Sequence, residues 1–143
     1  MSKRAARDDI WLLSRLDYIW SSYFPDVPQT NRIFIKFGRF AKLRLGSIKL
    51  DKKTGASFIT ISGMFKDLAI PVEVIDHTIG HELTHYTHGF SSLHPRLHRY
   101  PHEGGVVKRE MEKRGMGELH RAYQEWIKLY KKQLMGSRHG YYR

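Results

Sequence analysis

The sequence predicts an α+β fold with helices at both ends and a small sheet between them. Apolar residues recur at helical spacing over 8–24 and again in the second half, whereas residues 32–63 hold three short stretches rich in β-branched and aromatic residues. At 143 residues the chain has the length of one domain. We therefore expect a single domain over 1–143, with its core over about 8–134 and a flexible tail over 135–143.

The first predicted element is a helix over 8–24, and a sheet follows it. One face of this helix carries its apolar residues: Ile10, Leu13, Leu16, Trp20 and Tyr23. The stretch FPDVPQTN ends the helix because it contains two prolines. Three strands are predicted in the sequences RIFIKFGRF, RLGSIKLD and ASFITISG. Because short loops join them, including the turn signal DKKTG, we expect a three-stranded, mainly antiparallel sheet built as a meander.

The rest of the chain is predicted to be helical. Pro71 suits the first position of a helix that runs to about His88. The N–H at that position has no partner within the helix, so nothing is lost when proline lacks it. The loop GFSSLHPRLHRYPHEGG then leads to a helix over about 106–114. Residues 117–134 have the spacing of a last, amphipathic helix.

The composition limits the sites that the chain can form. It has no cysteine, so disulfides and thiolate metal sites are excluded, and a metal must be held by His, Asp or Glu. A formal net charge of +11 favours polyanionic partners. No apolar run reaches the roughly 18 residues of a spanning helix, and the start MSKRAARDDI lacks the apolar core of a signal peptide. We expect a cytoplasmic protein.

The segment HTIGHELTHYTHGF carries four histidines, at positions 77, 81, 85 and 88. On a helix they share one side, opposite an apolar arc. Two imidazoles four residues apart can point at one ion, and the glutamate of His-Glu-x-x-His lies beside them. This pattern is typical of a catalytic zinc ion bound by His81 and His85, with Glu82 taking a proton from the water on the metal.

The other polar residues of this helix have less certain roles. We expect His77 and His88 to surround the site rather than to bind the metal, because a third ligand usually comes from a separate segment. Asp76 either orients a ligand ring together with His77 or only interacts with the positive end of its own helix.

The residues alone leave the third ligand open. A thermolysin-like site takes a glutamate from the following helix, for which Glu110 is the best placed. A histidine just before that helix is the alternative, and His102 fits this position; His94 and His98 are further candidates. The long metzincin motif does not match, since its glycine and third histidine fall on His88 and Ser91.

The order of these motifs resembles the SprT-like metalloprotease family over about residues 8–115. The resemblance rests on the leading helix, the strand sequences RIFIKFGRFAKLRLGSIKL and SFITIS, the metal helix VIDHTIGHELTHYTHG and the segment HEGGVVKREMEKRG. It implies a zincin-like fold, endopeptidase activity and a third histidine ligand at His102. It also implies a substrate strand along a sheet edge, for which we expect SFITIS. Many relatives carry a cysteine zinc ribbon, which this chain lacks.

We therefore expect a zinc-dependent endopeptidase, with zinc on His81, His85 and His102 and with Glu82 as the general base. The alternatives are a non-catalytic nucleic-acid-binding module with a structural zinc, closed by a fourth ligand from His88, His94 or His98, and a minimal gluzincin-type peptidase that uses Glu110. The hydrogen-bond donor for the oxyanion stays open among Tyr86, Tyr100 and the arginines of the 96–99 loop.

We also expect the chain to bind DNA, which would make DNA-associated proteins its substrates. Basic residues occur at the start, across the first two strands, in the loop before His102 and near the end: Lys3, Arg4, Arg7, Lys36, Arg39, Lys42, Arg44, Arg96, Arg99, Lys128, Lys131 and Lys132. Such charges suit phosphate contacts, and no base-reading motif accompanies them. Aromatic residues among them are candidates for stacking on unpaired bases: Phe37, Phe40, Tyr141 and Tyr142.

Overall fold

The computed structural model describes residues 6–139, with side chains to residue 134. The elements are, in chain order, α1 (Asp9–Tyr23), β1 (Ile33–Phe37), β2 (Gly46–Leu50), β3 (Ser57–Ile61), α2 (Val72–Thr87), α3 (Val106–Lys113) and α4 (Gly117–His139). Short 3-10 helices cover Gly63–Lys66 and Glu103–Gly105. The predicted α+β class is confirmed. Helix α4 continues past residue 134 to His139, and the remainder of the predicted tail, 140–143, lies outside the described residues.

The first helix forms where its periodicity predicted it. The Asp8 side chain caps its N-terminus by accepting a hydrogen bond from the backbone N–H of Trp11 at 2.8 Å. Its buried face consists of Leu12, Leu16 and Ile19. Asp9 accepts a hydrogen bond from the backbone N–H of Phe37 at 2.9 Å, which ties α1 to the end of β1.

The sheet is mixed, so the prediction of an antiparallel meander was wrong. The strand order is β1-β3-β2, with β1 parallel and β2 antiparallel to the central β3. Loop 38–45 passes around the end of β3, because it joins β1 to β2 and these strands lie on opposite sides of β3. It is held there because Ser62 donates from its N–H to the carbonyl of Leu45 and from its hydroxyl to the carbonyl of Ala41, at 2.8 and 2.7 Å. Strand β2 therefore lies at an edge.

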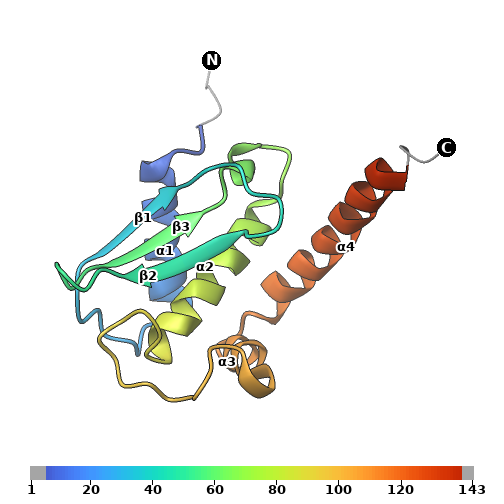
Figure 1. The fold of residues 1–143 in the computed structure, drawn as a ribbon. Coiled ribbons are helices and arrows are strands. Elements are labelled where there is room, and N and C mark those ends of the chain that lie inside the picture. The colour runs from blue at the N-terminus through green and yellow to red at the C-terminus, as the bar shows by residue number, and fades with distance from the viewer. Residues whose placement is uncertain (1–5, 140–143) are drawn as a thin grey trace.

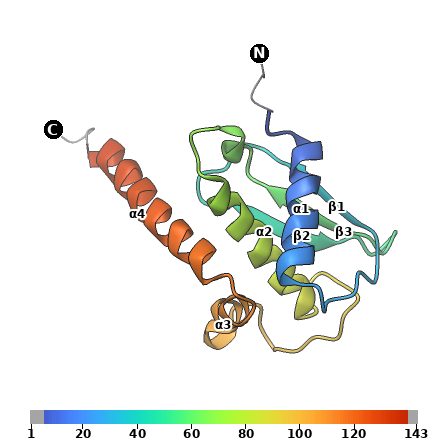
Figure 2. The same ribbon diagram turned by 180° about the vertical axis from the view of Figure 1, so that it is seen from behind.

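The core lies between the sheet and the helices. Helices α1 and α2 cover one face of the sheet, and the other face is open (Figures 1 and 2). Ile35, Phe37, Ile59 and Ile61 point into this core. Phe34, Lys36 and Lys49 are instead exposed on the open face, which follows from the two-residue period of a strand.

Helix α2 is enclosed on nearly all sides, which its polar face did not predict. Most of its residues are buried, including His77 and His85, because α3 and α4 cover the side away from the sheet. Pro71 occupies the N-cap rather than the first helical position. Gly80 lies against Met116, where a Cβ atom would collide with the Met116 side chain. This close approach brings the α3–α4 turn onto α2.

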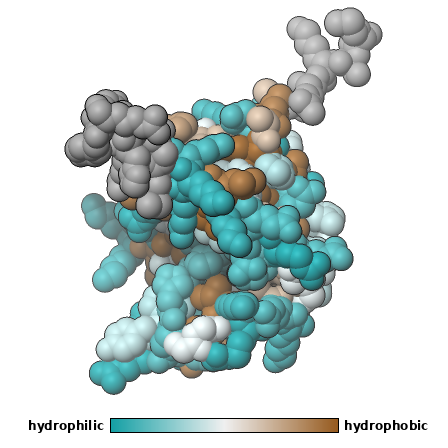
Figure 3. Space-filling view, turned by 90° about the vertical axis from the view of Figure 1, so that its right-hand side faces the viewer, coloured by the Kyte–Doolittle hydropathy of each residue, from teal (hydrophilic) through white to brown (hydrophobic). Residues whose placement is uncertain are grey.

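Helix α4 packs beside α2 at its start and extends away from the sheet toward the C-terminus (Figure 1). Its aromatic stripe covers the loops at the end of the sheet: Trp126 packs on Phe65, and the Tyr130 hydroxyl donates to the carbonyl of Lys42 at 3.0 Å. Hydrophilic side chains dominate the face seen from the α4 side, with small hydrophobic areas between them (Figure 3). No helix within 6–139 is long and apolar enough to cross a membrane.

Candidate metal centre

Three histidine rings converge beside the buried helix. His81 and His85 come from successive turns of α2, and His102 comes from the loop that precedes α3. The Nε2 atom of His81 lies 3.1 Å from that of His85 and 3.2 Å from that of His102. One ligand atom of each ring lies within 4.8 Å of the others. These are the three ligands expected from the sequence, and we call them the histidine triad.

The geometry of the triad fits a zinc ion. Tetrahedral zinc with Zn–N bonds of about 2.0–2.1 Å places its ligand nitrogens roughly 3.3 Å apart, close to the separations seen here. Burial is the main cause, and neighbouring histidines a further cause, that lowers the pKa of His81 to about 4 and that of His85 to about 3. Both rings are therefore neutral at pH 7, which is the state that binds metal.

Glu82 lies beside the triad in a buried position. Its side chain is 5% exposed, and this burial raises its pKa to about 7, while the charge of Arg44 acts in the opposite direction. A Cβ atom on Gly46 would lie 3.2 Å from Glu82 Oε2 and 2.8 Å from Thr78 Cγ2. The glycine at the start of β2 thus lets the strand approach the carboxylate closely. A carboxyl group poised near neutral pH suits proton transfer.

Three cavities meet at the triad, and we name each by two residues that line it. The Arg44–Tyr123 cavity, of about 230 Å³, also contacts His81 and Glu82. The Arg44–His102 cavity, of about 300 Å³, contacts all three triad histidines and Glu82. The His102–Tyr123 cavity, of about 330 Å³, lies between α2, α3 and α4. The triad is therefore accessible from a cleft with several lobes.

The sheet edge next to the triad is β2. Gly46, Ser47 and Ile48 line the Arg44–His102 cavity. The sequence SFITIS, for which we expected a substrate-binding edge, forms the central strand β3, and both of its sides are occupied by strand partners. That expectation was wrong because it assumed the order of a meander.

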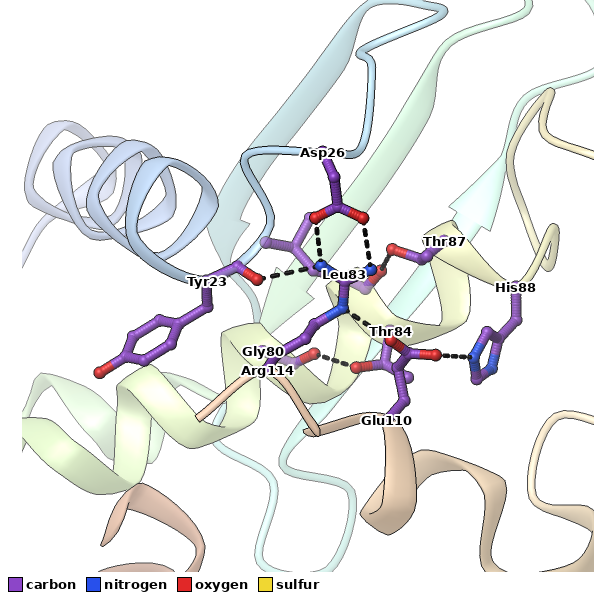
Figure 4. Close-up of polar contacts among 9 residues, drawn as sticks. All are labelled: Tyr23, Asp26, Gly80, Leu83, Thr84, Thr87, His88, Glu110 and Arg114. Carbon is purple, nitrogen blue, oxygen red and sulfur yellow. Dashed lines mark hydrogen bonds and ion pairs between the residues drawn. The ribbon is translucent and has the colours of Figure 1, made fainter. Parts of the chain in front are cut away.

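Glu110, the alternative third ligand, is engaged elsewhere (Figure 4). One carboxylate oxygen contacts His88 Nε2 at 3.1 Å, and the other accepts from Arg114 Nε at 2.8 Å. His98 packs against the His88 ring, and the His94 ring lies 2.8 Å from the carbonyl of Pro28. Within the described part of the chain, none of these side chains joins the triad as a third or fourth ligand.

Two further residues of α2 have partners that differ from those expected. Asp76 forms hydrogen bonds of 2.9 and 2.6 Å with Arg15 of α1, so it orients no ligand ring. The Nε2 atom of His77 lies 3.1 Å from His120 Nδ1, and its ring stacks on Tyr123 at 4.2 Å. His77 therefore connects α2 to α4 beside the triad.

The expected oxyanion donors do not reach the cleft. Tyr86 is fully buried, and its hydroxyl donates to Asn31 Oδ1 at 2.7 Å. Tyr100 is 57% exposed and lines none of the three cavities. The guanidinium groups of Arg96 and Arg99 lie over Phe90 and Tyr100.

Sequence reasoning missed Arg44 and Tyr123 as residues of the site. Tyr123 belongs to the amphipathic helix predicted over 117–134, and Arg44 is among the basic residues expected to contact phosphates. Neither residue carries a local motif, and both reach the cleft only because of the path of loop 38–45 and the packing of α4 on α2.

Comparison with protein-family models, with curated proteins and with solved structures gave no match for this chain. The fold and the site therefore carry the functional argument.

Proposed function

We propose that the chain is a zinc-dependent endopeptidase related to the SprT-like metalloproteases. The supporting observation is the placement of Glu82 beside three converging histidine nitrogens, at the bottom of an open cleft. Three protein ligands leave one coordination position for water or substrate, as in catalytic zinc sites, whereas structural sites are normally closed by a fourth ligand. This arrangement favours catalysis over the alternative of a binding module with a structural zinc.

The histidine triad and Glu82 have different roles in the proposed hydrolysis. His81, His85 and His102 would hold the zinc, which lowers the pKa of a bound water and polarises a carbonyl group when it is present. Glu82 accepts the proton of the attacking water and later returns it to the leaving amine. Burial supports this role of Glu82, since a raised pKa makes a carboxylate a stronger base.

A peptide is the substrate that the cleft fits best. The edge of β2 borders the cavity that contains all three triad histidines and Glu82. Along such an edge an extended chain can form main-chain hydrogen bonds, whatever its side chains are. We therefore expect cleavage of unfolded or extended segments.

Hydrolysis of an unfolded protein tests this function. The zinc-loaded parent should cleave it, and Glu82→Gln should retain zinc and fold but lose at least about a hundredfold in rate, because an amide cannot accept the proton. Glu73→Gln is the matched control, since Glu73 is exposed on the same helix. A Glu82→Gln protein that cleaves as fast as the parent would remove Glu82 from the mechanism.

We further propose that the chain binds single-stranded DNA. Phe34 and Phe58 stack side by side on the open face of the sheet, with ring centroids 5.2 Å apart, and Lys49 lies opposite Phe58 on β2. Arg39, Lys42 and Arg44 are exposed on the loop beside the cleft. Stacking aromatics among cations suit bases and phosphates without sequence preference.

The structure changes the set of residues that we expected to contact DNA. Phe37 is in the core, and Arg7 is buried, donating to the carbonyls of Phe65, Asp67 and Ile70. Phe40 is 64% exposed and remains a candidate. Lys3, Arg4, Tyr141 and Tyr142 lie outside the described residues.

A further inference from the structure

Tyr123 lies where two of the three cavities meet. It lines the Arg44–Tyr123 cavity together with His81 and Glu82. It also lines the His102–Tyr123 cavity together with His81 and His102. Tyr123 is thus the tyrosine that shares a cavity wall with both the expected general base and two of the triad histidines.

The ring of Tyr123 is held in place from the side of α2. It stacks on the His77 ring with 4.2 Å between centroids and an angle of 11° between planes. His77 is fixed in turn by His120, whose Nδ1 atom lies 3.1 Å from its Nε2 atom. Because His120 belongs to α4, as Tyr123 does, the three rings lock α4 against α2. A group held in this way can be aimed at the cleft without reorganising.

The hydroxyl group of Tyr123 is available to donate a hydrogen bond to a substrate. The hydroxyl groups of Tyr86 and Tyr130 donate to Asn31 Oδ1 and to the carbonyl of Lys42. That of Tyr123 has no hydrogen-bond partner among the residues that the structure describes. Burial raises the pKa of Tyr123, so its O–H stays protonated at neutral pH.

We propose that Tyr123 is a further catalytic residue, which donates a hydrogen bond to the scissile carbonyl oxygen as that oxygen becomes negative. This inference rests on the proposed peptidase function. Water oxygen forms a bond to the carbonyl carbon, the C=O π electrons move to the oxygen, and the water proton goes to Glu82. The C–N bond then breaks, the electrons return, and Glu82 gives the proton to the amine. Tyr123 keeps its own proton and stabilises the charge between these two steps.

Arg44 is the competing donor, because it lines the same cavity. It differs in being exposed on the loop before β2, whereas the Tyr123 ring is fixed by stacking. Its charge also acts on Glu82, lowering the pKa of that carboxyl group against the effect of burial. Because Arg44 is intact in Tyr123→Phe, a loss of kcat in that variant does not come from Arg44.

The test compares Tyr123→Phe with Tyr130→Phe, a matched change on the same helix whose hydroxyl bonds to Lys42 instead. Both zinc-loaded variants should match the parent in zinc content. Tyr123→Phe should also keep the thermal transition of the parent, since it removes no internal hydrogen bond, whereas Tyr130→Phe should unfold at a slightly lower temperature because it loses the bond to Lys42. Tyr123→Phe should lower kcat by about 10²- to 10³-fold with little change in KM. Tyr130→Phe should keep kcat within about twofold of the parent, because Tyr130 lines none of the three cavities.

A second readout does not depend on turnover. A phosphinic peptide carries a tetrahedral anion in place of the scissile bond, and Tyr123→Phe should weaken its binding at least about tenfold, as expected for a donor used in the transition state. An active parent with an equally active Tyr123→Phe, or unchanged phosphinate affinity, overturns the assignment and leaves the peptidase function standing. A zinc-loaded parent that cleaves no peptide overturns both.

Discussion

Arg114 and Asp26 form a two-bond ion pair, although 88 positions separate them in the chain: Nη1 lies 2.6 Å from Oδ1 and Nη2 lies 3.1 Å from Oδ2. The same guanidinium donates to Glu110 and to the carbonyl of Tyr23 (Figure 4). It also lies over the Phe24 ring. Glu110 contacts His88 at the end of α2. Arg114 thus joins the end of α1, α2 and α3, and it anchors the helix that His102 precedes.

Replacing Arg114 by methionine should destabilise the metal-free protein by roughly 1–3 kcal/mol, because it removes the hydrogen-bond donor of Glu110 Oε2 and of the Tyr23 carbonyl. Urea unfolding measures this change. Lys108→Met is the control, since the Lys108–Glu112 pair is exposed with 3.9 Å between its atoms, and it should cost less than about 0.5 kcal/mol. Equal losses in the two variants would show that the Arg114 contacts stabilise nothing.

Zinc affinity should separate the triad from its neighbours. Alanine at His81 or His85 should abolish tight binding, and His102→Ala should weaken it strongly, because each removes one of three ligands. Glu110→Ala and His98→Ala should bind zinc nearly as the parent does. Competition with a chelator measures all five. A loss of binding in Glu110→Ala that exceeds the loss in His102→Ala would move the site to the gluzincin type.

The metal-free protein should show how Glu82 titrates. Its pKa is raised to about 7 in the folded state from an ordinary value of 4.5, so the folded state keeps the proton to higher pH. The contribution of this group to stability is therefore lost as pH rises from 4.5 through 7 and stays lost above that value. Glu82→Gln cannot titrate. As pH rises across this window, the free energy of unfolding of Glu82→Gln should increase relative to that of the parent, by up to roughly 3 kcal/mol.

Unfolding at several pH values, without metal, gives this difference. The exposed Glu73→Gln should keep a nearly constant difference from the parent over the same range. A flat difference for Glu82→Gln as well would mean that the carboxyl group is not desolvated in solution.

DNA binding should depend steeply on salt and little on sequence, because contacts to phosphates release counterions. Phe34→Ala should weaken binding of a labelled single strand, since base stacking is worth about 1–3 kcal/mol per base. Ile10→Ala is the control: Ile10 is 80% exposed on α1, which covers the other face of the sheet. Binding that is undetectable at low salt, or insensitive to salt, would contradict this proposal.

The helices could be predicted from the sequence, whereas the order of the strands could not. Each helix has a local signal in the spacing of its apolar residues. In α1 that spacing predicted the helix but not its buried face, because Ile10 and Leu13 are exposed and Leu12 and Ile19 are buried. The strand order depends on Ser62 holding loop 38–45 across the end of β3, and hydrogen bonds between distant residues leave no periodic pattern. Because the predicted strand order was wrong, SFITIS was wrongly expected at a sheet edge.

Some residues of the site could likewise be predicted from the sequence, and others could not. His81, Glu82 and His85 were predicted because helical spacing alone brings them together. His102 was selected through a family resemblance, and the structure places it with the other two. Glu110 contacts His88 at the end of α2, and Asp76 contacts Arg15 of α1, so these partners come from other helices. Tyr123 reaches the cleft through the packing of α4, so its position could be found only in the folded chain.

A crystal structure of the zinc-loaded protein tests the central claim most directly. We predict one ion bound by Nε2 of His81, His85 and His102, with a non-protein ligand in the fourth position on the side of Glu82. An ion closed by a fourth protein ligand such as His88 or His98, or an ion bound away from the triad, would contradict the account.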